Sequence, residues 1–476
     1  MRKKRDRPFF NDLKIVGREL ENYFYESETK QAPVLRQKRT EQLIHELDLE
    51  RHIEKGDLTG ETLKRFLSLY LAETTRLHHP GFLAHQVARP HPTGALGSLI
   101  DGATNNAMAI YEMGPAASSI EYFMINWMLK KVGWETVPSY KQLDMQSNHA
   151  GGVLTHGGSL ANTTALLAAR SATIPNFWNE GGSGKHVVLV PEQSHYSLKR
   201  SVGTLGLGEK NCLTLPADRD GRVAPDLIPP LLEKLKAEGL HVMAIVANAC
   251  GTAAGLYDPL ERIADICEKY GIWLHVDAAH GGGAMVSENQ RFLVRGIDRA
   301  DSIIWDAHKM LFTPTLCAAV LCKDHRHLDG AFQLEASYLI HSKDQPGIDF
   351  LPRTMECTKA GLGLRFFMSL AAMGEAGLAA SIDQIVGNAQ QAAEWLASQK
   401  GFEVAIKPET NIVCFRYGAG DDNQLEIRRE LLRNGNFYIS TTLYRGCRWM
   451  RLVFMNPQTT LGEIKDLAKE IRAISS

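Results

Sequence analysis

One lysine stands where a lysine can act as a nucleophile. It is Lys309, and it ends the run DSIIWDAHK at residues 301–309. The apolar residues of this run predict a short buried strand, and the polar residues after them predict a turn. A lysine in such a partly dry place loses its proton more readily than a solvated one, so it can attack a carbonyl carbon. The commoner alternative for any single lysine is a solvated surface charge, so other residues must decide between the two.

Two stretches upstream supply groups that such a lysine could use. Residues 272–283, IWLHVDAAHGGG, predict another apolar strand, which ends at the acid Asp277. Residues 155–162, THGGSLAN, predict a glycine-serine turn that opens a helix, and such a turn can seat a phosphate. A phosphate seat, a strand-end acid and a strand-end lysine are what pyridoxal 5′-phosphate (PLP) needs. The lysine forms a Schiff base with PLP, and the acid keeps the pyridine nitrogen protonated, so that the ring accepts electrons.

Together the three stretches resemble those of the group II PLP-dependent amino-acid decarboxylases. This family includes glutamate, aromatic amino acid, histidine, cysteine sulfinate and diaminobutyrate decarboxylases. The resemblance runs from about residue 78 to near the C-terminus. It implies an α/β protein of PLP fold type I, as in aspartate aminotransferase, whose large domain has a mostly parallel seven-stranded sheet. It also implies a small C-terminal α/β domain and a helical N-terminal segment that packs across a homodimer.

The pattern along the chain predicts three segments. Residues 1–91 form the helical dimerisation segment, residues 92–366 the large PLP-binding domain, and residues 367–476 the small C-terminal domain. In the middle segment helical runs alternate with strand-like runs, which cover residues 186–190, 242–247, 272–276, 302–305 and 318–321. Such alternation predicts a largely parallel sheet covered on both faces, and ligands of such sheets bind at the carboxyl ends of strands.

The resemblance also implies roles for four residues around the cofactor ring. Lys309 is expected to hold PLP covalently and, once freed, to move protons. Asp277 is expected to pair with the pyridine nitrogen, because a carboxylate there favours its charged form. His195 matches the histidine that stacks on one face of the ring and can contribute to protonation, and Ala279 is expected to pack on the other face. The alternatives are a helix-capping aspartate for Asp277 and a core histidine for His195.

Five further residues are expected near the cofactor. Gly158 and Ser159 match the phosphate contacts, through backbone N–H groups and a hydroxyl, and His308 is expected to assist them. Thr252 matches a family threonine near PLP. Asp306 is a departure, because the aromatic and glutamate enzymes carry an asparagine there that contacts the phosphate. The diaminobutyrate type shares the aspartate, so the departure points to a subfamily, and the role of Asp306 stays open.

Three residues bear on the substrate and the reaction. Arg451 matches the arginine that grips the substrate carboxylate, a task suited to the planar fork of a guanidinium. His85 stands where glutamate decarboxylases carry glutamine and diaminobutyrate-type enzymes carry histidine, so it is a candidate for the substrate pocket. Tyr338 lies at the same offset from the lysine as the family's mobile-loop tyrosine, which protonates Cα after carbon dioxide leaves. The alternatives are a surface-strand arginine, a loop histidine and an ordinary loop aromatic.

Composition restricts the partners and the location. The 53 basic and 54 acidic residues give a net charge of −1, which argues against nucleic acid or an anionic membrane as the main partner. No apolar stretch reaches the roughly 18 residues that span a bilayer, and no apolar core follows the basic N-terminus, so neither a membrane span nor a secretory signal is expected. The eight scattered cysteines favour a reducing cytoplasm. No His-Glu-x-x-His motif occurs, so no metal is expected.

The sequence therefore predicts a cytoplasmic, homodimeric PLP-dependent L-amino-acid α-decarboxylase that releases carbon dioxide and an amine. The predicted substrate is a small polar amino acid, with diaminobutyrate ahead of aspartate, glutamate and cysteine sulfinate. An aromatic substrate ranks lower. Two alternatives stay open: a PLP enzyme that performs transamination, elimination or oxidative deamination, and a non-catalytic dimer whose pocket serves binding or regulation.

Overall fold

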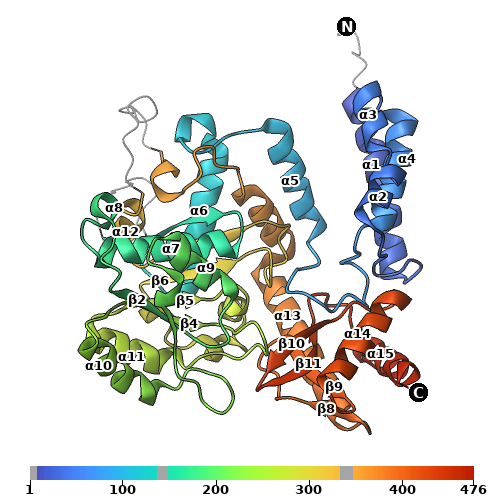
Figure 1. Ribbon diagram of the computed structural model, residues 1–476. Helices are drawn as coiled ribbons and strands as arrows, with labels where there is room; N and C mark the ends of the chain where they lie inside the picture. The colour runs from blue at the N-terminus through green and yellow to red at the C-terminus, as the bar shows by residue number, and fades with distance from the viewer. Residues whose placement is uncertain (1–7, 137–147, 333–346, 476) are drawn as a thin grey trace. The chain divides into compact units, whose positions relative to one another are not determined.

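The computed structural model describes residues 8–136, 148–332 and 347–475 (Figure 1). The chain packs as two compact units. The large unit consists of Gln86–Gly387 with Pro408–Asn411, and the small unit consists of Met1–His85, Asn388–Lys407 and Ile412–Ser476. Compact units are not by themselves folding domains, so the three-segment division predicted from the sequence stays a prediction.

The large unit is built on a seven-stranded sheet, as predicted. Its strands, in order across the sheet, are β1 (Gly151–Thr155), β7 (Ala318–Cys322), β6 (Ser302–Asp306), β5 (Trp273–Asp277), β4 (His241–Asn248), β2 (His186–Val190) and β3 (Cys212–Thr214). The pairs from β6 through β5, β4 and β2 to β3 are all parallel. Strand β7 runs antiparallel to both of its neighbours. The predicted mostly parallel sheet is confirmed, with β7 as its exception.

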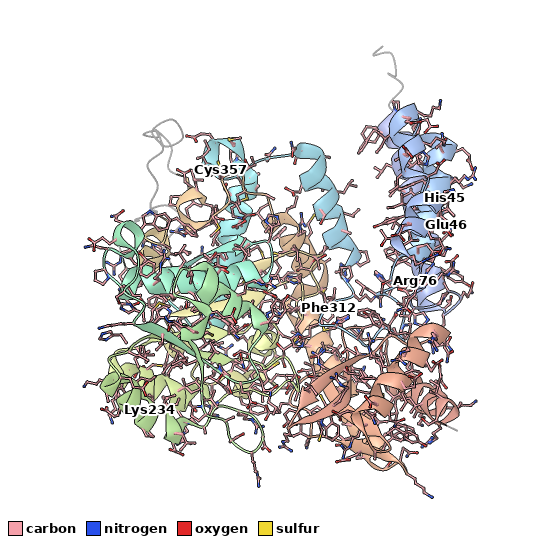
Figure 2. The ribbon with its side chains drawn as sticks, viewed as in Figure 1. His45, Glu46, Arg76, Lys234, Phe312 and Cys357 are labelled. Atoms are coloured by element: carbon pink, nitrogen blue, oxygen red, sulfur yellow. The ribbon has the colours of Figure 1, made fainter. Side chains whose placement is uncertain are left out.

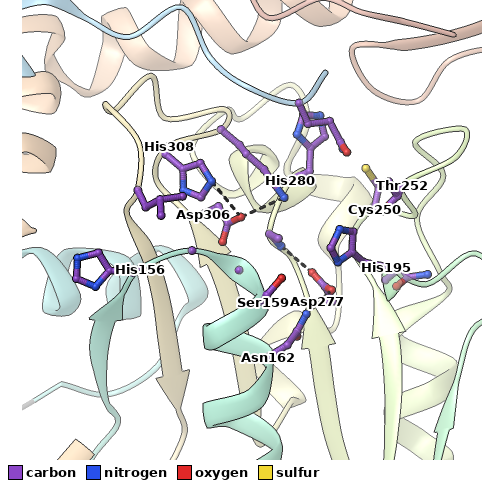
Figure 3. A pocket seen from close by; sticks show the side chains of 17 residues that line it. His156, Ser159, Asn162, His195, Cys250, Thr252, Asp277, His280, Asp306 and His308 are labelled. Atoms are coloured by element: carbon purple, nitrogen blue, oxygen red, sulfur yellow. Dashed lines mark hydrogen bonds and ion pairs between the residues drawn. The ribbon is translucent and has the colours of Figure 1, made fainter. Parts of the chain in front are cut away.

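Helices cover this sheet on both faces. Every residue of β1, β5, β6 and β7 is buried, as expected of strands with helices on each side. Helix α7 (Gly158–Thr173) packs across β4 to β7. Its buried face carries Ala161, Ala165 and Ala168, and these small side chains let the helix backbone lie close to the strands. The start of α7 is thereby fixed at the edge of the sheet where β5 and β6 end (Figure 3).

The remaining helices of the large unit surround this core. The α-helices are α5 (Pro92–Thr104), α6 (Pro115–Val132), α8 (Phe177–Glu180), α9 (Tyr196–Thr204), α10 (Ile228–Ala237), α11 (Leu260–Tyr270), α12 (His325–Asp329) and the first part of α13 (Gly363–Ala397). Short 3₁₀ turns lie at Tyr111–Met113, Glu209–Asn211, Pro225–Leu227, Gly281–Met285, Arg291–Val294, Ile297–Arg299 and Leu351–Arg353. Among the helices of the described residues, none is long and apolar enough to cross a bilayer.

The small unit has a four-stranded antiparallel sheet. Its strand order is β10 (Ser440–Tyr444), β11 (Cys447–Val453), β9 (Ile412–Tyr417) and β8 (Phe402–Val404). Helices α14 (Asp421–Asn434) and α15 (Leu461–Ile474) pack with each other, and α14 packs on β10 and β11. Helix α15 begins with a capping box, in which the side chains of Thr460 and Glu463 satisfy free backbone N–H groups.

Four N-terminal helices belong to the same small unit. They are α1 (Pro8–Glu28), α2 (Thr40–Glu46), α3 (Leu49–Lys55) and α4 (Gly60–Glu73), and α1 packs along α4 (Figure 1). Arg76, labelled in Figure 2, is buried and donates hydrogen bonds to Tyr23 O at 3.1 Å and to Ser27 Oγ at 3.0 Å. The segment after α4 is hydrogen-bonded to the C-terminal part of the same unit, where Leu83 N donates to Tyr438 O at 2.9 Å.

A buried ion pair supports edge strand β1. Glu121 on α6 and Lys359 are both fully buried, and Lys359 Nζ lies 2.7 Å from Glu121 Oε2. The other oxygen, Oε1, accepts a hydrogen bond from Leu154 N in β1 at 2.9 Å. Burial raises the pKa of the Glu121 carboxyl, and the charge of Lys359 opposes that rise. The pair thus satisfies a strand N–H three residues before the turn at Gly157.

Replacement of Lys359 by methionine should lower the free energy of unfolding by about 3–5 kcal/mol, because it leaves the Glu121 carboxylate buried without its partner. Urea denaturation followed by circular dichroism measures the change. The matched control is the double variant Glu121→Gln/Lys359→Met, which buries no net charge and keeps an acceptor for Leu154 N. It should lose less stability than the single variant, and equal losses would contradict the electrostatic explanation.

Candidate active site

The candidate site is a cavity of about 260 Å³ in the large unit (Figure 3). It lies at the carboxyl ends of β5 and β6 and at the start of α7. All nine residues predicted to bind the cofactor line it, namely Gly158, Ser159, His195, Thr252, Asp277, Ala279, Asp306, His308 and Lys309. Parallel pairing explains the convergence: Asp277 lies opposite Ile304, so β5 and β6 end at the same edge of the sheet.

Lys309 is held by the turn that follows β6. Its backbone N donates to Asp306 O at 3.3 Å, and its own O accepts from Phe312 N at 3.1 Å. The side chain is 19% exposed, and its Nζ lies 3.1 Å from Asp306 Oδ2. The predicted nucleophile is therefore mostly shielded from water and paired with a buried carboxylate.

Asp277 is oriented by two donors. Its Oδ2 accepts from Asn162 Nδ2 at 3.0 Å, and its Oδ1 accepts from Ala279 N at 3.1 Å. Asn162 Oδ1 in turn lies 2.9 Å from His275 Nε2, and His275 Nδ1 lies 2.9 Å from Ser302 Oγ. Burial lowers the pKa of His275 to about 4, with the charge of Asp277 opposing, so the imidazole is neutral at neutral pH.

The direction of these hydrogen bonds follows from the donors. Asn162 uses its amide N–H on Asp277, so its oxygen faces His275 and accepts from the Nε2–H of the neutral imidazole. Ser302 then donates its hydroxyl to Nδ1, while Ser302 Oγ accepts from Trp273 Nε1 at 2.9 Å. Asp277 is thus the acceptor in each of its hydrogen bonds within this network, and it can accept one more from a protonated ring nitrogen in the cavity.

His195 caps the start of α9. Its Nδ1 accepts from Ser197 N at 3.3 Å and lies 2.7 Å from Ser197 Oγ. The proton of the neutral ring is therefore on Nε2. Burial lowers the pKa of His195, and the positive Lys309 adds to this, while Asp277 and Asp306 oppose it. Figure 3 shows His195 beside Asp277, on the far side of the cavity from His308.

The start of α7 has the features of an anion seat. Gly157 has φ +100°, a conformation that L side chains rarely adopt, and α7 begins at Gly158. A Cβ on Gly158 would lie 2.8 Å from Asp306 Oδ2, so a larger residue there would have to displace that carboxylate. The first N–H groups of a helix have no partner within it and carry partial positive charge, which favours a bound phosphate. Ser159 lies in this first turn and also lines the cavity.

His308 and Thr252 are two further predicted cofactor residues that line the cavity. His308 Nδ1 lies 2.8 Å from Cys317 O, and His308 Nε2 lies 3.7 Å from Asp306 Oδ2. Thr252 follows β4 and lines the cavity next to Cys250 (Figure 3). The described residues contain no cluster of three or more histidine, cysteine, aspartate or glutamate side chains suited to a metal ion.

Arg451 and His85, the predicted substrate residues, lie together in the small unit. Arg451 is buried, and its Nη1 donates to Ala84 O at 3.3 Å and to Ser440 Oγ at 3.4 Å. His85 is exposed, and its Nε2 lies 2.8 Å from Tyr438 Oη. Although the residue as a whole is exposed, partial desolvation of its ring lowers the pKa of His85, and the nearby Arg451 and Arg428 lower it further. Their roles stay predictions. Tyr338 lies outside the described residues.

Several residues that line the cavity or support it were not predicted from the sequence. Gln86, His156, Asn248, Cys250, His280 and Leu316 line it, and Asn162 and His275 hold Asp277. The sequence does contain a signal for His275. It is a polar residue two positions before Asp277 in an apolar strand, so its side chain lies on the same face of the strand as that of Asp277. No comparable signal marks Gln86 or Leu316.

The described residues fit PLP at each of its three recognition points. Lys309 offers an amine for the aldehyde, Asp277 offers an unused acceptor for the pyridine nitrogen, and the start of α7 offers N–H groups for the phosphate. Asp306 is the exception, because its Oδ1 is buried without a hydrogen-bond partner among the described residues.

The comparisons with known proteins agree with this fit. The family model described as "Pyridoxal-dependent decarboxylase conserved domain" matches residues 60–418. The acidic amino acid decarboxylase GADL1 of Mus musculus is 27% identical over 458 residues, which cover 91% of this chain and 80% of that protein. The L-2,4-diaminobutyrate decarboxylase of Acinetobacter baumannii is 27% identical over 437 residues, which cover 87% of this chain and 83% of that protein.

Solved structures show the same fold. Mouse CSAD in its apo form is 25% identical and superposes with a TM-score of 0.84, covering 97% of this chain and 99% of that one. A Vibrio parahaemolyticus structure titled as the glutamate decarboxylase domain of a diaminobutyrate-pyruvate transaminase and L-2,4-diaminobutyrate decarboxylase superposes with a TM-score of 0.81. It is 23% identical and covers 98% of this chain and 95% of that one. The predicted cofactor and fold are confirmed: this chain belongs to the family of pyridoxal-dependent decarboxylases, and it is an amino-acid decarboxylase that uses PLP.

Proposed function

We propose that this decarboxylase acts on a small polar L-amino acid and releases carbon dioxide and the corresponding amine. The observation that supports it most directly is the meeting of Lys309, Asp277 and the start of α7 in one cavity. Support for the substrate class comes from relatives named for acidic amino acids and for diaminobutyrate. Diaminobutyrate ranks first, followed by aspartate, glutamate and cysteine sulfinate, and aromatic amino acids rank below these.

The residues of the cavity divide the work. When bound, PLP supplies an electron sink for the bond that breaks at Cα. Asp277 would hold a positive charge on the ring nitrogen, because Asn162 and Ala279 N fix its carboxylate as an acceptor. His195, whose Nδ1 is used by Ser197, would cover one face of the ring, and the small side chain of Ala279 would leave room on the other face. Lys309 would anchor the cofactor and, once released, would be available to move protons.

Arg451 and His85 complete the proposal on the substrate side. The guanidinium of Arg451 suits a carboxylate, and its donors to Ala84 O and Ser440 Oγ hold it in one orientation. His85 pairs with Tyr438 and stands close enough to Arg451 to be affected by its charge. Tyr338 is proposed to return a proton to Cα, which makes the amine the product instead of an aldehyde.

The location and assembly are also proposals. All eight cysteines are free thiols, which fits the reducing cytoplasm, and recovery of the protein in a membrane or secreted fraction would contradict that location. Family resemblance favours a homodimer. One face of α5 carries Leu96, Leu99 and Ile100, which are 53%, 40% and 44% exposed, and such a row of apolar side chains is suited to a second copy of the chain.

Replacement of Lys309 by alanine should abolish carbon dioxide release, because Lys309 is the one primary amine among the described residues of the cavity. Borohydride reduction of the purified protein, then digestion and mass spectrometry, should place the reduced cofactor on the peptide that contains Lys309. Lys323→Ala removes an exposed lysine just after β7 and is the matched control. Cofactor on another lysine, or turnover by Lys309→Ala, would contradict the proposal.

A panel of amino acids tests the substrate class. The panel contains diaminobutyrate, aspartate, glutamate, cysteine sulfinate, tyrosine and tryptophan, and both amine and carbon dioxide are measured. A higher kcat/KM for one of the first four is expected, and Arg451→Met should raise KM for that substrate more than it lowers kcat. A preference for tyrosine or tryptophan would overturn the ranking. Keto acid, ammonia or peroxide in place of amine would favour the alternative reaction types.

Sedimentation of the purified protein should give twice the 52.8 kDa mass of the chain. The variant Leu96→Glu/Ile100→Glu should shift the protein to the monomer, because it places two charges on the apolar face of α5. Leu227→Glu changes an equally exposed leucine elsewhere in the large unit and should leave the dimer intact. A monomeric native protein would contradict the proposal.

A further inference from the structure

The carboxylate of Asp306 lies at the start of α7, where the phosphate seat is proposed. Asp306 is the last residue of β6 and is 1% exposed. A Cβ on Gly158, the first residue of α7, would lie 2.8 Å from Oδ2 and 3.0 Å from Oδ1. Figure 3 shows the side chain between His308 and the first turn of α7. The N-terminal end of this helix therefore already faces one buried anionic group.

The two oxygens of this carboxylate have different surroundings. Oδ2 lies 3.1 Å from Lys309 Nζ and 3.7 Å from His308 Nε2. Oδ1 is buried and has no hydrogen-bond partner among the described residues. From other elements, His195 on α9 and Cys317 before β7 are the titratable groups on which the charge of Asp306 acts. One oxygen is thus paired with Lys309, and the other is buried beside the first turn of α7 with no hydrogen-bond partner among the described residues.

Binding of PLP removes this balance. The amine of Lys309 would become the anchor of the cofactor, so it would no longer serve Asp306 alone. The phosphate would bring up to two negative charges to the same helix end. Two like charges at contact in a buried site do not both stay ionised. A proton between them turns the repulsion into a charge-assisted O–H···O hydrogen bond, and it supplies the partner that Oδ1 lacks.

We propose that Asp306 and the cofactor's phosphate share one proton. Each PLP molecule that binds through its phosphate would then be accompanied by the uptake of one proton from water. The proposal rests on the proposed phosphate seat at Gly158 and Ser159. It gives Asp306 a binding role that an asparagine could not fill in the same way, because an asparagine would meet the phosphate without taking up a proton. PLP affinity should then fall as pH rises, since the shared proton becomes harder to supply.

The test compares the dissociation constant of PLP for the native protein and for Asp306→Asn from pH 7 to pH 9, measured by quenching of protein fluorescence. The ratio of the native to the variant constant should rise by up to about tenfold per pH unit, as expected when one proton is bound with the ligand. Asp298→Asn, which changes an exposed aspartate of the same unit, is the matched control and should follow the native protein.

Pyridoxal, which lacks the phosphate, separates this role from simple competition for Lys309. For pyridoxal, the ratio of the native to the variant dissociation constant should not change with pH. If this ratio depended on pH as strongly as the ratio for PLP, the proposal would be overturned, because Asp306 would then act through Lys309 alone. If PLP is bound at Lys309 but the ratio of its dissociation constants does not change with pH, the shared proton would be overturned and the proposed function would stand. Absence of PLP from Lys309 after borohydride reduction would overturn both.

Discussion

The parallel pairing of β5 with β6 is the constraint on which the site depends. Asp277, the last residue of β5, lies opposite Ile304, two residues before β6 ends, so both strands end at the same edge of the sheet and deliver Asp277 and Lys309 to one cavity. Parallel strands need helical crossovers, and these bury both faces of the sheet, which leaves the strand ends as the place where polar groups can be reached. A shift of one residue between the strands would turn every side chain of β6 to the other face.

Helix α7 depends on the same arrangement. Its alanine-rich face packs over the central strands, and this fixes its first turn above the ends of β5 and β6. The same helix carries Asn162, which orients Asp277 and connects it to the buried His275. Each hydrogen-bonding group along this chain has a partner, and in a dry interior a satisfied polar network is rigid where a partly satisfied one would be costly. The sheet, the helix and the candidate site are therefore one packed structure.

Electrostatics in the cavity are unevenly compensated. Asp277 receives two hydrogen bonds and has a defined acceptor role, whereas Asp306 has Lys309 on one oxygen and no partner among the described residues on the other. Glu121, buried beneath β1, shows the fully compensated case, with Lys359 on one oxygen and Leu154 N on the other. Because both oxygens of Glu121 have partners and one oxygen of Asp306 has none, we relate Glu121 to the stability of the fold and Asp306 to the binding of a ligand.

The α/β class, the mostly parallel sheet, the family and the groups that meet in the cavity could all be predicted before the fold was known. The signals for them are local: an apolar run followed by Asp277 or Lys309 marks both a strand and its end, and Gly157 with Gly158 marks a turn into a helix. Predictions that fall on Tyr338 lie outside the described residues and stay predictions.

Contacts between residues far apart in the chain could not be predicted in this way. The contacts of His275 with Asn162, 113 positions away, and of Asp306 with Gly158 appear in no local pattern. They depend on how β5 and β6 are aligned and on how closely α7 packs against them. Chain periodicity tells which face a side chain takes, but the partner that it meets across a core is set by the packing of elements far apart in the chain.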